Sequence, residues 1–370
     1  MQSHKVAVLK SENYGEEAIE AVINLLELLD FRTKKNSVFL KPNMIEDAEP
    51  SSCVITHPDV IRGVIRYFKS KGIDKFFLGD GPRMGINMER AFSATGYEKL
   101  AKEEGVQLVD LYKSERKPVN WKFGTLELPS IAFDSCYVNI AKMKTHCQTT
   151  VTLGMKNQKG LLKYQDKKLF HNINLNAAIV ELSKVVRPEL TVLDGIWGIE
   201  GNGPGRTGKK KKAGVIVAGT DMYAVDSVGA GLMGVPVEEI AQLSAVKIPS
   251  FKLIGDDVAS LSSNWLRAKS WHRLLNIYIW WDEYACSGCH GTLLSSLKKA
   301  AMSNPKYLFK LILNGVLGRL DIVMGKNPPL PEKHGKVVLV GNCAALKFGE
   351  KADVIVRGCP PTAEGLLEAL

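Results

Sequence analysis

Four of the seven cysteines are spaced as ligands of a metal centre. Cys286 and Cys289 form a Cys-x-x-Cys motif, whereas Cys343 and Cys359 each follow a short apolar segment. A turn at the motif brings two thiolates to one centre, and Gly288 lets the backbone pass close to a bulky ligand. A zinc site made of four cysteines usually has two such motifs, so a single motif with two dispersed cysteines favours an iron–sulfur cluster. A zinc site and unligated thiols stay open as alternatives.

The segment over residues 142–162, KMKTHCQTTVTLGMKNQKGLL, is rich in groups that bind anions or transfer protons. Lys144 and Lys156 supply ammonium groups, and His146 in the segment and His171 beyond it are of the type that titrates near neutral pH. The set favours a pocket for a carboxylate or a phosphate, with these four residues as candidate catalytic groups. For each of them taken alone, the favoured interpretation is a solvated lysine or a histidine that bonds to backbone carbonyls.

Further polar residues follow the strand-like segments. Lys41 and Asn43 come after SVFL, Asp80 follows KFFLG, and Asp194 ends LTVLD. In a parallel sheet, such residues meet in loops beyond the carboxyl ends of the strands. We therefore predict that these four residues and Asn157 bind a cofactor or ligand. Coordination of a divalent cation, orientation of a lysine and helix capping are open roles for the aspartates.

Three other features are weaker candidates for a functional role. For Asp226, capping of a helix is the favoured role. Cys147 lies beside His146, which suggests a cysteine nucleophile with a histidine base. The sequence does not indicate a third group that would orient this pair. The segment Gly203–Lys209, GPGRTGK, resembles the start of a phosphate-binding P-loop, yet Lys210 stands where Ser or Thr should bind magnesium and a strand-like segment follows. We predict no nucleotide P-loop there, although a basic loop that closes over an anion stays open.

Strand-like and helix-like segments alternate along most of the chain. Apolar runs such as KVAVL, CYVNI and AGVIVAG are separated by amphipathic stretches such as EEAIEAVINLLELLD. This alternation is typical of a mainly parallel sheet with helices on both faces. We therefore predict an α/β domain over residues 1–262.

A tryptophan-rich stretch marks a boundary near residues 255–275. Beyond it, the sequence predicts a helix or helix pair over residues 291–318 and two short strands, KVVLVG and ADVIVRG, that each lead into a cysteine. We therefore predict a smaller, cluster-binding α/β module over residues 263–370.

Composition and charge disfavour several function classes. The formal net charge is +10, with 49 Lys and Arg against 39 Asp and Glu. The lysines are dispersed apart from Lys209–Lys212 and no nucleic-acid-binding motif accompanies them, so we predict no nucleic-acid partner. The first residues lack an apolar signal region, and the apolar stretches at 277–281 and 307–325 are short or interrupted by charges. We expect a cytoplasmic protein without a membrane span or disulfides, in which 307–325 is still suited to lie on a surface or against a partner.

A series of short polar motifs runs through the chain up to residue 240. It comprises Lys41-Pro42-Asn43, His57-Pro58, Gly79-Asp80, Val138-Asn139, Lys144-Thr145-His146, Thr152–Asn157 with Gly160, His171, Asp194-Gly195, Gly203-Pro204 and Asp226. In this series the chain resembles the family catalogued as domain of unknown function 362, whose members often carry iron–sulfur modules. The resemblance implies the fold and a shared polar site, and it implies no particular reaction.

The C-terminal residues carry a second resemblance. Gly358-Cys359-Pro360-Pro361, the leucines after it and the segment Gly-Asn-Cys343 are similar to the cluster-binding end of the proximal-cluster subunit shared by respiratory complex I and nickel–iron hydrogenases. This resemblance implies a [4Fe–4S] cluster held by Cys286, Cys289, Cys343 and Cys359.

The leading hypothesis is a [4Fe–4S] oxidoreductase or electron-transfer protein that acts on an anionic small molecule in the larger domain. Such a protein would exchange electrons with a ferredoxin-like or oxidoreductase partner. Two alternatives stay open. The first is a non-redox enzyme acting on a carboxylate or phosphate, with a structural cluster or zinc ion. The second is an electron-carrier subunit that docks on a redox partner and has no substrate of its own.

Overall fold

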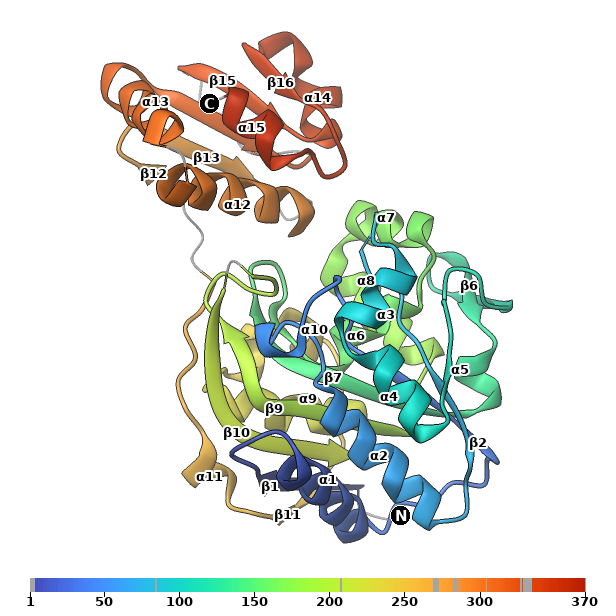
Figure 1. Cartoon of the computed structure of the whole chain (residues 1–370). Coiled ribbons are helices and arrows are strands. Elements are labelled where there is room, and N and C mark those ends of the chain that lie inside the picture. The colour runs from blue at the N-terminus through green and yellow to red at the C-terminus, as the bar shows by residue number, and fades with distance from the viewer. Residues whose placement is uncertain are drawn as a thin grey trace. The chain divides into compact units, whose positions relative to one another are not determined.

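The computed structural model describes residues 4–83, 85–206, 208–268, 273–281, 285, 287–303, 305–326, 328 and 335–369. The chain divides into two compact units, each with its own sheet (Figure 1). The larger unit comprises Met1–Phe170 and Asn176–Ala268, and the smaller one comprises His171–Leu175 and Lys269–Leu370.

The larger unit is built on a nine-stranded sheet, as far as the structure describes it. Its main path runs, in spatial order, through β11 (Phe251–Gly255), β1 (His4–Lys10), β10 (Lys209–Gly219), β9 (Leu190–Glu200), β7 (Cys136–His146), β2 (Ser37–Pro42), β3 (Lys75–Leu78) and β4 (Gln107–Leu108), and β8 (Thr150–Thr152) pairs with β7. Strands β9, β7, β2, β3 and β4 are parallel to one another, whereas β10 and β8 run antiparallel to their neighbours. The predicted, mainly parallel sheet is confirmed.

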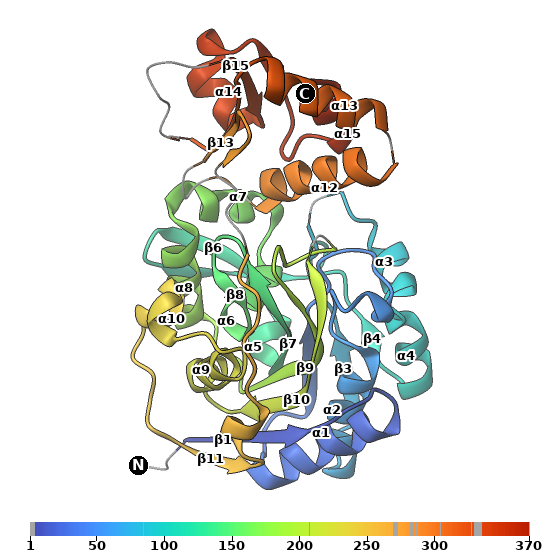
Figure 2. The ribbon, with the colours of Figure 1, turned by 90° about the vertical axis from the view of Figure 1, so that its left-hand side faces the viewer.

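Helices cover both faces of this sheet. Helices α1 and α2 lie on one side and α8, α9 and α10 on the other, with the strands between them (Figure 2). The helices of this part of the chain are α1 (Glu16–Leu29), η1 (Pro50–Ser52), α2 (Pro58–Ser70), α3 (Met88–Ala94), α4 (Tyr97–Glu104), α5 (Ile131–Asp134), α6 (Gly154–Asn157), η2 (Gln158–Leu161), α7 (Tyr164–Ile173), α8 (Leu175–Val185), α9 (Met222–Leu232), η3 (Val237–Glu239), α10 (Ala241–Ser244) and α11 (Val258–Leu261). A separate hairpin is formed by β5 (Arg116–Trp121) and β6 (Gly124–Pro129). Apolar side chains of α1 and α2 join those of β2 and β7 in one buried core.

Strand β7 explains why polar chemistry gathers in this unit. All eleven of its residues are buried. Its first half, CYVNIA, is largely apolar, as expected for a strand covered on both faces. Its second half, KMKTH, carries Lys142, Lys144 and His146 at the carboxyl end. Buried charges of this kind need partners, and the neighbouring strand ends supply them.

The smaller unit contains a five-stranded sheet in the described residues. The order is β12 (Arg273–Leu274), β13 (Ile277–Trp281), β14 (Leu320–Met324), β15 (Lys336–Val340) and β16 (Val354–Val356), and the last four strands are parallel. The accompanying helices are α12 (Ser287–Ser303), α13 (Pro305–Leu317), α14 (Asn342–Phe348), η4 (Gly349–Lys351) and α15 (Ala363–Ala369). The structure thus confirms the helix pair and both cysteine-preceding strands that the sequence predicts. Within the described part of the chain, no helix is long and apolar enough to cross a membrane.

Candidate functional site: a lysine-rich edge of the large sheet

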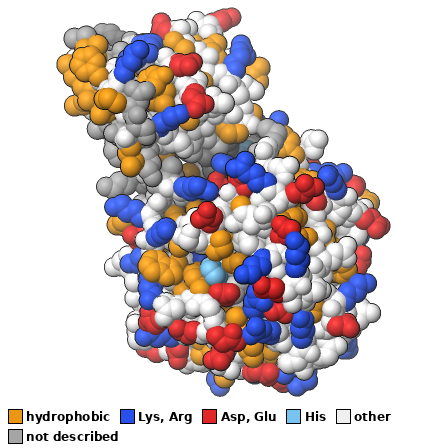
Figure 3. Space-filling model, in the orientation of Figure 1, with side chains coloured by type: hydrophobic (Ala, Val, Ile, Leu, Met, Phe, Trp, Pro, Cys, Tyr) orange, Lys and Arg blue, Asp and Glu red, His pale blue; other side chains and the backbone are white. Residues whose placement is uncertain are grey.

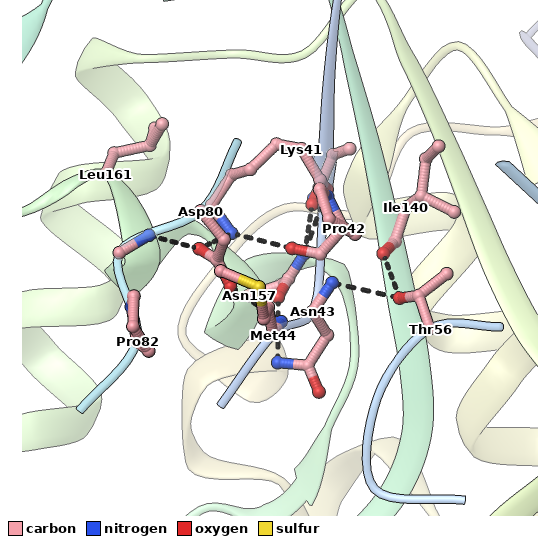
Figure 4. Close-up of polar contacts among 12 residues, drawn as sticks. Lys41, Pro42, Asn43, Met44, Thr56, Asp80, Pro82, Ile140, Asn157 and Leu161 are labelled. Atoms are coloured by element: carbon pink, nitrogen blue, oxygen red, sulfur yellow. Dashed lines mark hydrogen bonds and ion pairs between the residues drawn. The ribbon is translucent and has the colours of Figure 1, made fainter. Parts of the chain in front are cut away.

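Lys41 and Asp80 form a buried ion pair at the carboxyl ends of the neighbouring strands β2 and β3. Lys41 Nζ lies 2.8 Å from Asp80 Oδ1, and both side chains are almost completely buried. Gly81 N donates to Asp80 Oδ1 at 2.9 Å and Met44 N donates to Asp80 Oδ2 at 2.7 Å (Figure 4). Burial lowers the pKa of Lys41, and the Asp80 carboxylate opposes that shift. The carboxylate therefore ties the loop after β2 to the loop after β3.

Three asparagines and Lys144 form a second buried network. Lys144 Nζ donates to Asn43 Oδ1 at 2.5 Å, and Asn43 Nδ2 donates to Asn157 Oδ1 at 3.2 Å. Asn157 Nδ2 donates in turn to Asn139 Oδ1 at 2.8 Å. Asn157 also points its amide at the carbonyl oxygens of Lys41 and Pro42 (Figure 4). The structure thus brings together the predicted residues Lys41, Asn43, Asp80, Lys144 and Asn157.

Among the residues that the structure describes, no carboxylate lies within hydrogen-bonding distance of the Lys144 ammonium group. Its acceptors are Asn43 Oδ1 and, at 2.8 Å, the carbonyl oxygen of Val54. Burial, reinforced by the nearby charges of Lys142 and Lys156, lowers the pKa of Lys144 to about 7. Lys144 can therefore give or take a proton near neutral pH, and a bound anion would stabilise its charged form.

The lowered pKa of Lys144 predicts a specific pH dependence of stability. Between the folded-state pKa of about 7 and the ordinary lysine pKa of about 10.4, the unfolded chain binds a proton that the folded chain does not. Stability contributed through this group therefore rises with pH in that window, by up to about 1.4 kcal/mol per pH unit. We expect wild type to gain stability relative to Lys144→Met between pH 7 and pH 9.

Urea unfolding of both proteins at several pH values measures this difference. Lys102→Met is the matched control, because the Lys102 side chain is 75% exposed. Its difference from wild type should stay flat over the same range. A flat difference for Lys144→Met as well would show that Lys144 keeps its proton in the folded chain.

Lys142, Asp194 and Tyr14 form a third buried cluster at the same edge. Lys142 Nζ lies 2.8 Å from Asp194 Oδ2 and donates to the Tyr14 hydroxyl at 2.5 Å. The Tyr14 hydroxyl donates to Asp194 Oδ1 at 2.9 Å, and His57 N donates to Asp194 Oδ2, also at 2.9 Å. The rings of Tyr14 and His57 are stacked, with centroids 3.6 Å apart and planes 8° from parallel. Asp194 thus orients a lysine, and burial together with the Asp194 charge raises the pKa of Tyr14.

Two more lysines lie near these clusters. Lys156 is half-buried on α6, and burial lowers its pKa to about 8. Lys167, on α7, donates to the carbonyl oxygens of Gly81 (2.6 Å) and Pro82 (2.9 Å) and to the hydroxyl of Tyr112 (2.7 Å). Burial lowers the pKa of Lys167 to about 7. Lys167 is not among the residues selected from the sequence, because it lies on a helix and follows no strand.

The two candidate histidines are placed differently. His146, the last residue of β7, is buried, and its Nδ1 accepts hydrogen bonds from the backbone of Gln148 (3.0 Å) and Thr149 (3.3 Å). Those bonds hold the turn between β7 and β8 and leave Nδ1 without a proton. His171 lies on α7, one turn beyond Lys167.

Asp226 acts at a helix terminus. Its two carboxylate oxygens accept hydrogen bonds from Gly154 N (2.7 Å) and Met155 N (2.8 Å), the first amides of α6. Burial raises the pKa of Asp226 to about 7, and the two backbone bonds oppose that shift. Asp226 therefore caps α6 from helix α9, the kind of role favoured for it from the sequence. The P-loop-like segment leads into strand β10, as predicted.

Three of the four selected cysteines lie in the described part of the smaller unit, and Cys286 lies outside the described residues. Cys343 and Cys359 follow the neighbouring parallel strands β15 and β16. The residues just before them are paired, since Asn342 N donates to Gly358 O (3.1 Å) and Gly358 N donates to Asn342 Oδ1 (2.9 Å). Cys289 comes from the first turn of α12.

Gly341 lies close to the sulfur of Cys289. A Cβ atom at Gly341 would stand 2.9 Å from Cys289 Sγ, so a side chain at this position would fill the space beside the thiol. Over the described residues, no three His, Cys, Asp or Glu side chains converge tightly enough to hold a metal ion. In a cluster each thiolate binds a different iron atom, which spreads the thiols further than a single ion does. Thiols that are further apart than a single ion allows, with Gly341 leaving space beside one of them, fit an iron–sulfur cluster.

The larger unit is an α/β fold with buried lysines, asparagines and aspartates at the carboxyl edge of its sheet. Residues 38–231 match the family model described as domain of unknown function (DUF362), and the chain belongs to this family. The matched range contains all of the candidate residues selected in the larger domain, and also Lys142 and Lys167. The predicted family resemblance is confirmed. The resemblance of the C-terminal residues to complex I and hydrogenase subunits stays a prediction.

The chain is 30% identical over 257 residues to the thylakoid-associated protein sll1697 of Synechocystis sp. (strain ATCC 27184 / PCC 6803 / Kazusa). The similarity covers 66% of this chain and 77% of that protein.

Proposed function

We propose that this protein is a [4Fe–4S] oxidoreductase or electron-transfer protein whose larger unit binds an anionic small molecule. The observation that best supports an anion-binding site is the environment of the buried Lys144 ammonium group. Its two hydrogen-bond acceptors, at the carboxyl edge of the sheet, are both neutral. A carboxylate or phosphate placed there would supply the missing negative charge. In open α/β sheets this edge is also where ligands commonly bind.

The residues of the edge have distinct parts in this proposal. Lys144 and Lys156, with pKa values lowered to about 7 and about 8, neutralise the anion and exchange protons with it. Asn43 and Asn157 position Lys144 through their amides. The Lys41–Asp80 and Lys142–Asp194 pairs hold the strand ends that carry these groups.

The cluster would be held by Cys286, Cys289, Cys343 and Cys359. Support comes from the paired backbone before Cys343 and Cys359 and from Gly341 beside the Cys289 sulfur. When bound, such a cluster supplies one-electron transfer. A cytoplasmic protein of this kind needs a redox partner, and the net charge of +10 favours a partner with an acidic docking face. We propose no nucleic-acid partner.

Metal analysis after anaerobic purification tests the cluster. We expect about four iron atoms and four sulfide ions per chain, with an EPR signal that appears on reduction by dithionite. Cys359→Ser should lose most of the iron and the signal. Cys147→Ser, an exposed cysteine in the larger unit, is the matched control and should keep both.

The opposite result is equally clear. About one zinc ion per chain without sulfide would contradict the redox proposal and would leave an enzyme or binding protein with a structural metal.

A further inference from the structure

Helix α13 of the smaller unit exposes an apolar stripe. Phe309, Ile312, Leu313 and Val316 are 68%, 47%, 40% and 63% exposed. Their spacing of three and four residues places them on one side of the helix. Gly315 is buried, and a Cβ atom there would stand 3.3 Å from Ile277 Cγ1, so another side of the helix contacts strand β13. In Figure 3, hydrophobic side chains gather where Figure 1 labels α13.

The charges on α12 and α13 themselves have one sign, and the acidic residues near them belong to α15, where Glu364 pairs with Lys299 (2.7 Å) and the backbone oxygen of Glu368 accepts from Lys310 Nζ (2.9 Å). Helices α12 and α13 contain no Asp or Glu in their sequences, and they contain Lys298, Lys299, Lys306 and Lys310. Lys306 and Lys310 are one turn apart, and the helical spacing puts them next to Phe309 and Leu313. A basic border beside an exposed apolar stripe is complementary to a surface that combines hydrocarbon with negative charge.

We propose that α13 binds the surface of an anionic lipid membrane. The four apolar side chains enter the boundary between headgroups and acyl chains, and Lys306 and Lys310 contact the phosphates. A second copy of the chain fits this face less well, because its own α13 offers the same two lysines and no acidic side chain to pair with them. The proposal concerns a different surface from the lysine-rich edge and does not depend on the cluster.

Co-sedimentation of the full chain with lipid vesicles tests the proposal. Vesicles of phosphatidylcholine and phosphatidylglycerol mixed at about two to one should bind the protein, and vesicles of phosphatidylcholine alone should bind it much less. Added salt should weaken the binding to the anionic vesicles, because the lysine contribution is screened.

Two variants separate the apolar and the charged contributions. Phe309→Ser combined with Val316→Ser removes the two most exposed apolar side chains of the stripe and should weaken binding by about tenfold or more. Lys306→Gln combined with Lys310→Gln should weaken binding to anionic vesicles by about thirtyfold and leave the weak binding to neutral vesicles unchanged. Leu346→Ser, on helix α14, is the matched control, because Leu346 is 88% exposed and lies outside α13. It should bind like wild type.

Three results would overturn the proposal. The first is wild-type protein that stays in the supernatant with anionic vesicles. The second is an equal loss of binding in Leu346→Ser, which would remove the assignment to α13. The third is a dimer in light scattering that Phe309→Ser with Val316→Ser converts to monomer without vesicle binding in either protein, which would make the stripe a contact between copies. Circular dichroism and thermal unfolding of each variant verify that its fold is retained.

Discussion

Replacing Asp194 by alanine is expected to lower the free energy of unfolding by about 3–5 kcal/mol, the usual cost of breaking a buried ion pair from one side. The change leaves the Lys142 ammonium group buried without its charged partner, since Asp194 Oδ2 lies 2.8 Å from Lys142 Nζ. It also removes the acceptor for the Tyr14 hydroxyl and for His57 N. Three donors from three parts of the chain therefore lose one acceptor. Chemical denaturation monitored by fluorescence or circular dichroism measures the loss.

Two further variants make this result specific. Glu98→Gln breaks an exposed ion pair of the same length, 2.8 Å between Lys102 Nζ and Glu98 Oε1, and should leave the melting temperature unchanged. Lys142→Met combined with Asp194→Leu removes both buried charges, so it should be clearly more stable than Asp194→Ala alone. A double variant as unstable as the single one would mean that the Tyr14 and His57 contacts, and not the ion pair, account for the loss.

The sequence was sufficient to predict where the polar residues gather. Alternating apolar and amphipathic segments predicted parallel strands, and parallel strands place their carboxyl ends at one edge. That reasoning located Lys41, Asn43 and Asp80, and the density of anion-binding groups over residues 142–162 located Lys144. The structure brings the four residues together. The structure supplies the strand order β7-β2-β3, which the apolar pattern does not encode and which puts these strand ends side by side.

The sequence did not show which side chains at this edge of the sheet form hydrogen bonds and ion pairs with each other. Tyr14 and Asp194 are 180 positions apart in the sequence, and their hydrogen bond depends on how the loop before α1 folds over the sheet. No periodic pattern encodes such a loop contact. Lys142 did carry a signal, because a lysine two residues before Lys144 in a strand points to the same face. Lys167 carried none, since its contacts arise from the packing of α7 against the loop after β3.

Replacing Gly160 by alanine is expected to destabilise the protein by about 3 kcal/mol, because the new methyl group overpacks a buried ion pair. A Cβ atom at Gly160 would stand 1.8 Å from Asp80 Oδ1 and 2.6 Å from Lys41 Nζ, far inside contact distance, so the pair or the η2 turn must move. Gly231→Ala is the matched control: the site is exposed, helical and has no neighbour within 4 Å, so this variant should gain about 0.5–1 kcal/mol instead. Urea unfolding of the two variants measures both the expected loss of stability in Gly160→Ala and the expected gain in Gly231→Ala. Equal stability of Gly160→Ala and wild type would show that the η2 turn does not pack against the Lys41–Asp80 pair, and the edge would then have room for a ligand at that point.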